Sequence, residues 1–191
     1  TGEEGTAVTF ASGETTAAVL DGFTITTNIG TGIRCTNASS PIIRHNIIRN
    51  NYGMMGGGGG VYSYSATPVI EGNLIRNNGT GIWCVYGSAV IRNNLIVRNT
   101  AGGMEGGGAG GVYGYSSSPQ LVSNTFYGND GGYDWWGGGF QAGAILVYNG
   151  APTVRDCILW GNTVNGGSTP SQVTVYSGSV TMVQQSGAES T

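Results

Sequence analysis

Short runs in which hydrophobic and polar residues alternate recur along the whole chain. Strict alternation over four or five residues predicts a β-strand with one buried face. No window keeps the 3.6-residue apolar period of a helix, so we expect an all-β protein with essentially no helix. The clearest runs are GIRC (32–35), GVYSY (60–64), GIWC (81–84), GVYGY (111–115) and AILVY (144–148).

A second set of segments aligns without gaps and defines a repeat. Each copy has two apolar positions five residues apart, as in Ile43 and Ile48. Successive copies lie 21 to 33 residues apart, which fits a minimum coil of 21 residues with insertions at one corner. The copies are PIIRHNIIRNN (41–51), PVIEGNLIRNN (68–78), AVIRNNLIVRN (89–99), PQLVSNTFYGN (119–129) and PTVRDCILWGN (152–162), with a partial copy VLDGFTITTN (19–28).

Repeats that cannot bury their own apolar face must stack on their neighbours and form one continuous core. Strands that recur once per coil then pair in parallel, about 4.8 Å apart, and parallel crossovers are nearly always right-handed. We therefore predict a single-domain right-handed parallel β-helix, a solenoid of about seven coils, over residues 1–191. Residues 1–18 would form the opening coil, 19–163 the regular repeats with Gly-rich insertions, and 164–191 the closing coil.

Asparagine recurs at two fixed positions of the repeat, both next to turns. Asn tolerates left-handed backbone, and its amide both donates and accepts hydrogen bonds. Identical turns stacked coil over coil would let each side chain bond the next, so we assign these residues a structural role. One column holds Asn46, Asn73, Asn94 and Asn124, with Cys157 in the equivalent place, and the other holds Asn28, Asn51, Asn78, Asn99, Asn129 and Asn162.

Two runs, GGGVYSYSATPVIEGNLIRNN and GGVYGYSSSPQLVSNTFYGN, resemble the right-handed β-helix repeats of large secreted or surface proteins of environmental bacteria. VLDGFTI (19–25) looks like their opening coil, and RDCILWGNT (155–163) with PSQVTVYSGSV (170–180) looks like their closing coils. The likeness covers roughly residues 6–185 and implies an extracellular or cell-surface location. The wider superfamily includes pectate lyases, polygalacturonases, epimerases and phage tailspikes, alongside adhesins, so the likeness implies a fold and no single activity.

Composition excludes several classes of function. Only 9% of residues are charged, the net charge is −3, and all seven basic residues are arginines. Nucleic-acid binding needs clustered Lys and Arg, so no nucleic-acid partner is expected. No apolar stretch approaches the ~20 residues of a membrane helix, so no membrane insertion is expected either.

Groups that could support catalysis or hold a cofactor are scarce. A glycosidase needs paired carboxylates and a lyase needs a base beside the sugar, but no two of the four aspartates share a column of the repeat. Asp130 and Asp134 lie in one loop and are a candidate Ca²⁺ site, with a solvated loop as the simpler interpretation. Cys35 and Cys84 share an inward column two coils apart, about 9.6 Å, which is too far for a disulfide. We assign no catalytic residue and no other cofactor.

Charged residues fall into two outward columns. Arg44, Glu71 and Arg92 alternate in sign along the first column, which favours ion pairs between coils. Arg49 and Arg76 stack as like charges in the second, in line with Val97, Tyr127 and Trp160. For this second column both a solvated face and a contact with an anion or acidic sugar stay open.

Aromatic residues give the strongest functional signal. They occupy outward positions of the alternating strands, and the Gly-rich insertions add more at one corner of the coil. Three roles are open, namely sheet stabilisation through cross-strand pairs, a platform for sugar rings, and a protein interface. The residues are Tyr62, Tyr64, Trp83, Tyr113, Tyr115 and Tyr148 in the strands, and Tyr133, Trp135, Trp136 and Phe140 in the last insertion. Leu146 is expected to point outward as well, in the same column as Tyr62, Trp83 and Tyr113.

A β-helix must cover its terminal coils, because an open coil is an unpaired edge, and neither end of the sequence forms an obvious cap. We therefore expect an extracellular, non-catalytic structural or adhesive module. Its partners would be copies of itself, joined head to tail, or other surface proteins. The alternative is a β-helix that binds or processes polysaccharide, as a lyase or hydrolase does.

Overall fold

A computed structural model describes most of the chain. The described residues are 5–27, 29–53, 59–102, 107–133 and 140–183, together with the backbone of 187–188. Four residues singled out in the sequence, Asn28, Asp134, Trp135 and Trp136, lie outside the described residues.

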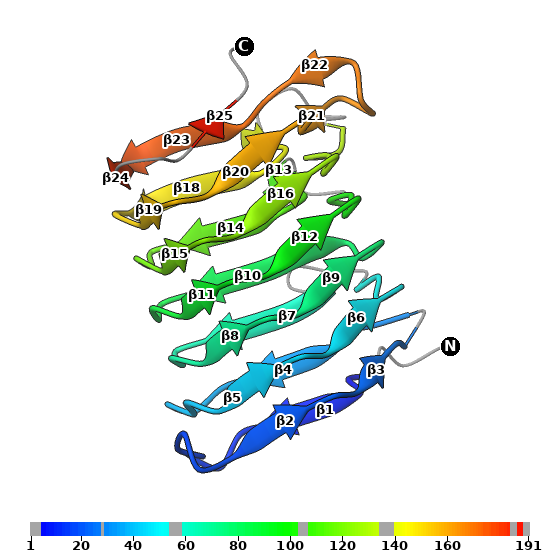
Figure 1. Cartoon of the computed structure of the whole chain (residues 1–191), viewed down its shortest axis with the longest axis vertical. Helices are drawn as coiled ribbons and strands as arrows, with labels where there is room; N and C mark the ends of the chain where they lie inside the picture. Colours follow the sequence, from blue (N-terminus) through cyan, green and yellow to red (C-terminus); the bar gives the residue numbers. More distant parts are fainter. Residues whose placement is uncertain are drawn as a thin grey trace.

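The chain winds as a right-handed parallel β-helix, as the repeat predicts (Figure 1). Each coil contributes one strand to each of three parallel sheets, and each sheet has seven strands, which gives the seven coils expected. No helix occurs in the part of the chain that the structure describes. Accordingly, none of the described residues forms a helix that could cross a membrane.

Three sheets, which we call A, B and C, follow one another in every coil. Sheet A contains β1 (Val8–Phe10), β4 (Ile33–Cys35), β7 (Gly59–Tyr64), β10 (Thr80–Val85), β14 (Val112–Tyr115), β18 (Ile145–Gly150) and β23 (Val173–Gly178). Sheet B contains β2 (Val19–Asp21), β5 (Ile42–Arg44), β8 (Val69–Glu71), β11 (Val90–Arg92), β15 (Gln120–Val122), β19 (Thr153–Arg155) and β24 (Thr181–Val183). Sheet C contains β3 (Thr24–Ile25), β6 (Ile47–Arg49), β9 (Leu74–Arg76), β12 (Leu95–Val97), β16 (Thr125–Tyr127), β20 (Ile158–Trp160) and β25 (Gly187–Ala188).

Apolar side chains from all three sheets fill the interior as continuous columns. Fully burying an Ile or Leu side chain contributes about 1.5–3 kcal/mol, so the core is the main stabilising element. The inward column of sheet A includes Ile33, Val61, Ile82, Val112 and Ile145, and those of sheets B and C include Ile43, Ile70, Ile91, Leu121, Val154, Ile48, Ile75, Ile96, Phe126 and Leu159, all buried.

Two ladders of buried asparagine side chains join the coils, one on each side of sheet C. In the middle of one ladder, the Asn99 side-chain oxygen accepts hydrogen bonds from the backbone N–H and the Nδ2 of Asn78, at 3.1 and 2.9 Å. Its own Nδ2 donates to the Ile75 carbonyl at 3.1 Å and to the Asn129 side chain at 2.9 Å. The same pattern runs through Asn51, Asn78, Asn99, Asn129 and Asn162, and through Asn46, Asn73, Asn94 and Asn124.

Other residue types continue the ladders at their ends. Cys157 takes the position of an asparagine, as the sequence alignment predicts, and its sulfur accepts the Asn124 N–H at 3.4 Å. Gln172 accepts from the Asn162 amide at 2.7 Å. On the first coil the donor to the Asn51 side chain is the N–H of Thr27, at 2.8 Å.

Insertions at the corner between sheets C and A form a small second layer. β13 (Gly107–Ala109) and β17 (Phe140–Ala142), from two different insertions, pair in parallel, so the insertions cluster along one edge as expected. This layer corrects one expectation, because Leu146 points outward from sheet A yet is only 1% exposed. It packs with Ala109 and Ala142 beneath the layer. A final pair, β21 (Thr163–Val164) with β22 (Thr169–Pro170), is antiparallel.

Replacing Asn99 with alanine should lower the free energy of unfolding by about 2–4 kcal/mol, because the substitution leaves buried groups without partners. The backbone N–H of Asn78 and the carbonyl of Ile75 would both lose their bonds to this side chain. Urea unfolding followed by circular dichroism measures the change. Gln120→Ala, which removes an exposed amide, is the control and should cost under about 0.5 kcal/mol. Equal effects of the two substitutions would contradict a stabilising ladder.

Candidate functional site

The outer side of sheet A carries most of the aromatic residues that the sequence singled out. Side chains alternate between the two faces of a strand, so residues two apart share the outer side. The strand register sets Tyr62 beside Trp83 and Trp83 beside Tyr113. We call the set the aromatic face, and it comprises Tyr62, Tyr64, Trp83, Tyr86, Tyr113, Tyr115, Phe140, Tyr148 and Tyr176.

Rings of neighbouring coils stack on one another within the aromatic face. The rings of Trp83 and Tyr113 are 5.2 Å apart with 21° between their planes. Tyr115 and Tyr148 are 4.9 Å apart at 9°, and Tyr148 and Tyr176 are 4.9 Å apart at 19°. Such pairs contribute about 0.5–1.5 kcal/mol each beyond the area they bury. The stacked rings therefore stabilise sheet A along the solenoid axis.

Edge-to-face contacts fill the place where the tyrosine column is interrupted. β10 carries Val85 between Tyr64 and Tyr115, and the ring of Tyr86 occupies this gap. Tyr86 lies 5.6 Å from Tyr64 and 5.8 Å from Tyr115, nearly perpendicular to both. The rings of the aromatic face thus contact one another, either stacked or edge to face. This arrangement favours sheet stabilisation over a sugar platform, which needs open flat surfaces.

The middle of the aromatic face is half-buried. Burial raises the pKa of Tyr113 to about 12, and the indole nitrogen of Trp83 is buried with no hydrogen-bond partner among the described residues. At one end, the Arg34 guanidinium lies 5.4 Å from the centre of the Tyr62 ring, a cation–π distance. Tyr133 belongs to the last insertion and lies against Gly166, between β21 and β22.

Asp130, half of the Ca²⁺ candidate, has structural partners. Its carboxylate accepts the Gly132 N–H at 2.7 Å and the Thr163 hydroxyl at 3.2 Å. The second half of the candidate, Asp134, is outside the described residues. Among the residues that the structure does describe, no group of three or more His, Cys, Asp or Glu could hold a metal ion.

Two buried thiols occupy the inward column that the sequence predicts. Ser63 separates Cys35 from Cys84 in the register of sheet A. Desolvation raises the pKa of each thiol to about 12. Cys157 also has a raised pKa for the same reason. Because the thiolate is the reactive form, burial makes these thiols weak nucleophiles in the folded chain.

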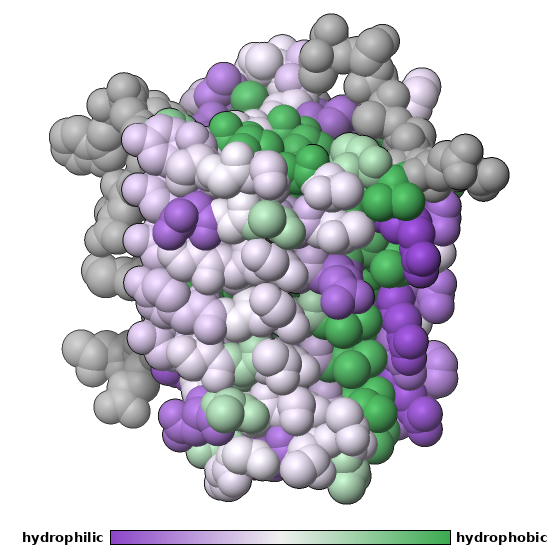
Figure 2. All heavy atoms as spheres, turned by 90° about the vertical axis from the view of Figure 1, so that its left-hand side faces the viewer, coloured by the Kyte–Doolittle hydropathy of each residue, from purple (hydrophilic) through white to green (hydrophobic). Residues whose placement is uncertain are grey.

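The charged column on sheet B forms ion pairs between coils, as predicted in part. Glu71 accepts from Arg92 Nε at 2.6 Å, whereas Arg44 pairs with Asp21 at 2.8 Å. His45 Nδ1 also lies 3.0 Å from Asp21, and the pKa of this carboxyl is lowered mainly by Arg44 and then by His45. Figure 2 shows this hydrophilic column beside a hydrophobic one along the solenoid. These groups are exposed or partly exposed, so the pairs stabilise the fold weakly.

Sheet C has an exposed apolar outer side, of which the sequence analysis identified one column and missed the other. Its two outward columns hold Ile47, Leu95 and Ile158, and then Tyr127 and Trp160, which are all exposed. Alternation along each strand could have revealed the first column. A residue two positions before a member of the arginine column must lie on the same outer side. Arg49 and Arg76 border this surface at one end, in the register that the sequence predicts.

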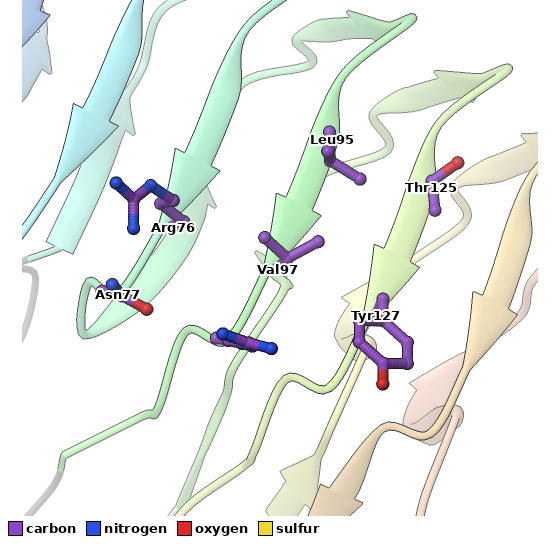
Figure 3. Close-up of a pocket in the computed structure, with 7 residues that line it drawn as sticks. Arg76, Asn77, Leu95, Val97, Thr125 and Tyr127 are labelled. Carbon is purple, nitrogen blue, oxygen red and sulfur yellow. The ribbon is translucent and has the colours of Figure 1, made fainter.

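A shallow hollow of about 340 Å³ lies on the outer side of sheet C (Figure 3). It spans β9, β12 and β16 and the turns that follow the first two. Its lining is Arg76, Asn77, Leu95, Val97, Arg98, Thr125 and Tyr127.

Comparison with known proteins identifies a fold family. Residues 3–144 match the family model described as the right handed beta helix region, which covers about three-quarters of the chain. No curated protein and no solved structure matches the chain.

At pH 8, iodoacetamide should leave Cys35 and Cys84 of the folded chain unmodified, because a pKa of about 12 leaves about one thiol in 10⁴ ionised. In guanidinium chloride the pKa returns to about 8.5, and both thiols should react within minutes. Mass spectrometry of tryptic peptides measures the modification, with the unfolded chain as the control. Rapid modification of the folded chain would contradict the buried positions.

Proposed function

This chain belongs to the right-handed β-helix family, and from that premise we propose that it is a structural module that stacks end to end on further copies of itself. The proposal includes a non-catalytic role without a resident cofactor and a location outside the cell or at its surface. The location rests on the resemblance of the repeats to secreted and surface β-helix proteins.

One observation carries the proposal, namely that the last coil leaves inward positions open. Val175 of β23 and Met182 of β24 are 42% and 46% exposed. Their register partners one coil earlier, Val147 and Val154, are 0% exposed. β23 and β24 cover the inward side chains of β18 and β19. An additional coil stacked on β23 and β24 would cover Val175 and Met182 in the same way.

The first coil presents a matching surface. Val8, Phe10 and Leu20 face inward but are only partly buried, because none of the described strands lies beyond β1 and β2 in sheets A and B. All strands of a sheet run parallel, so the last coil of one copy and the first coil of the next meet with the same polarity as two successive coils. Contact between unlike ends is heterologous and propagates into a filament.

The chemistry of sheet A supports a non-catalytic role. Its seven strands contain no Asp, Glu or His, which are the residues that glycosidases and lyases use as acids and bases. Asp130 is an acidic residue that the structure describes at the corner between sheets C and A. Its carboxylate oxygens already accept hydrogen bonds from Gly132 and Thr163.

Polysaccharide binding on the aromatic face is the second candidate. The rings of Tyr64 and Tyr86 are exposed at one border of this face, and Tyr86 is turned perpendicular to its neighbours. This ring could offer a flat surface to a sugar. The other stacked rings favour the structural proposal.

Sedimentation velocity over a concentration series should show reversible growth beyond the monomer, and negative-stain electron microscopy should show unbranched filaments one solenoid wide. Met182→Lys puts a charge on the open end and should raise the concentration for half-assembly at least about tenfold. The matched control is Ile158→Lys, since Ile158 is similarly exposed but lies on the side of the solenoid.

A chain that sediments as a monomer at every concentration would overturn the proposal. Equal loss of assembly in Met182→Lys and Ile158→Lys would move the contact from the ends to the side of the solenoid. Circular dichroism of both variants checks that the fold is retained.

A further inference from the structure

The hollow on sheet C exists because a short side chain stands between two long ones. Strand register places Val97 directly between Arg76 and Tyr127. Figure 3 shows Arg76 on one side, Tyr127 and Thr125 on the other, and Val97 with Leu95 between them. The depression therefore has an apolar floor, a cationic wall and a wall that carries two hydroxyl groups.

The arginines that line the hollow have no acidic partner among the described residues. Arg44, Arg92 and Arg155 each pair with a carboxylate, and Arg34 lies over a tyrosine ring. By contrast, no described carboxylate pairs with Arg76 or Arg98, which both line the hollow. Arg49 is next to Arg76 in the same column and keeps a buried Nε without a hydrogen-bond partner among the described residues.

This concentration of positive charge stands out in an acidic protein. The chain has a net charge of −3 and only seven basic residues. Three of them, Arg49, Arg76 and Arg98, gather at one edge of sheet C. Guanidinium groups recognise carboxylates through paired, charge-assisted hydrogen bonds. An anionic ligand would supply the partner that the described protein groups do not.

The backbone at Arg98 supports a role for its side chain. Arg98 has φ +52°, in the left-handed region. That conformation costs an ordinary side chain about 1–2 kcal/mol, whereas Gly and Asn adopt it readily. The equivalent positions in four other coils are filled by Asn50, Asn77, Gly128 and Gly161, all with positive φ. Arginine here is unfavourable for the turn, so its guanidinium beside the hollow needs another explanation.

We propose that the hollow on sheet C binds an aromatic carboxylate, with the carboxylate held by Arg76 and Arg98 and the ring on Val97 and Leu95. The volume of about 340 Å³ is at the lower end of small-molecule sites and suits one ring. The hydroxyls of Thr125 and Tyr127 stand across Val97 and Leu95 from Arg76, where a polar substituent of the ring would lie. The site is independent of the end-to-end contact, because it lies on the side of the solenoid.

Titration of the ¹⁵N-labelled chain with sodium benzoate at low, constant ionic strength tests the proposal. Amide shifts should change in a saturable way around residues 76–78, 95–98 and 125–127, with a dissociation constant on the order of 1 mM. Benzamide has the same shape without the charge and should bind at least about tenfold more weakly. Acetate has the charge without the ring and should also bind at least about tenfold more weakly.

Arg98→Asn is the decisive variant, because Asn occupies the same turn position in two other coils. It should fold at least as stably as the original chain and bind benzoate about tenfold more weakly. Arg76→Gln should weaken binding to a similar extent and provides a second variant if the first fails to fold. Arg155→Gln is the matched control, since Arg155 lies on sheet B, and should bind benzoate normally.

Several results would overturn the proposal. Non-saturable shifts up to about 20 mM benzoate would remove the site, as would shifts that cluster away from the three segments. Equal binding of benzamide and benzoate would exclude recognition of the carboxylate by the arginines. Unchanged benzoate binding in both Arg98→Asn and Arg76→Gln would exclude it too. Equal binding of acetate would exclude recognition of the ring.

Discussion

Buried hydrogen bonds between the side-chain amides of successive coils are the interaction on which the rest of this structure depends. A coil of 21 to 33 residues cannot enclose a core alone, so every coil relies on its neighbours. Asn46 stands immediately before β6 and Asn51 two residues after it, and the later coils repeat this arrangement. Each strand of sheet C is thereby fixed at both ends, and the register of the whole solenoid follows.

Fixed register turns single residues into functional surfaces. On sheet A it stacks Trp83 on Tyr113 and Tyr115 on Tyr148, which makes the aromatic face a stabilising element. On sheet C it sets a valine between an arginine and a tyrosine and so creates a hollow. At the last coil it leaves Met182 exposed where other coils are closed. The same periodicity therefore produces the stable body, the exposed end and the hollow on sheet C.

Much of this architecture can be predicted from the sequence, because each column of the repeat has one environment. The asparagine ladders, the Cys35–Ser63–Cys84 column and the Cys157 substitution follow from alignment of the repeats. Three features do not follow. Leu146 is buried because two Gly-rich insertions pair as β13 and β17, and irregular segments carry no pattern that predicts pairing. Ring orientation depends on rotamers that alternation does not specify. The hollow on sheet C depends on the relative lengths of three neighbouring side chains.

Hydrogen exchange of the ladder amides tests the central claim most directly. The backbone N–H groups of Asn78 and Asn99 donate to side chains of the next coil. If the ladders hold the coils together, these amides exchange only when the whole chain unfolds, as slowly as those of core strand residues such as Ile82 and Ile96. Exchange of Asn78 and Asn99 well before those strands would contradict the account, because the coils would then remain stacked without their ladders.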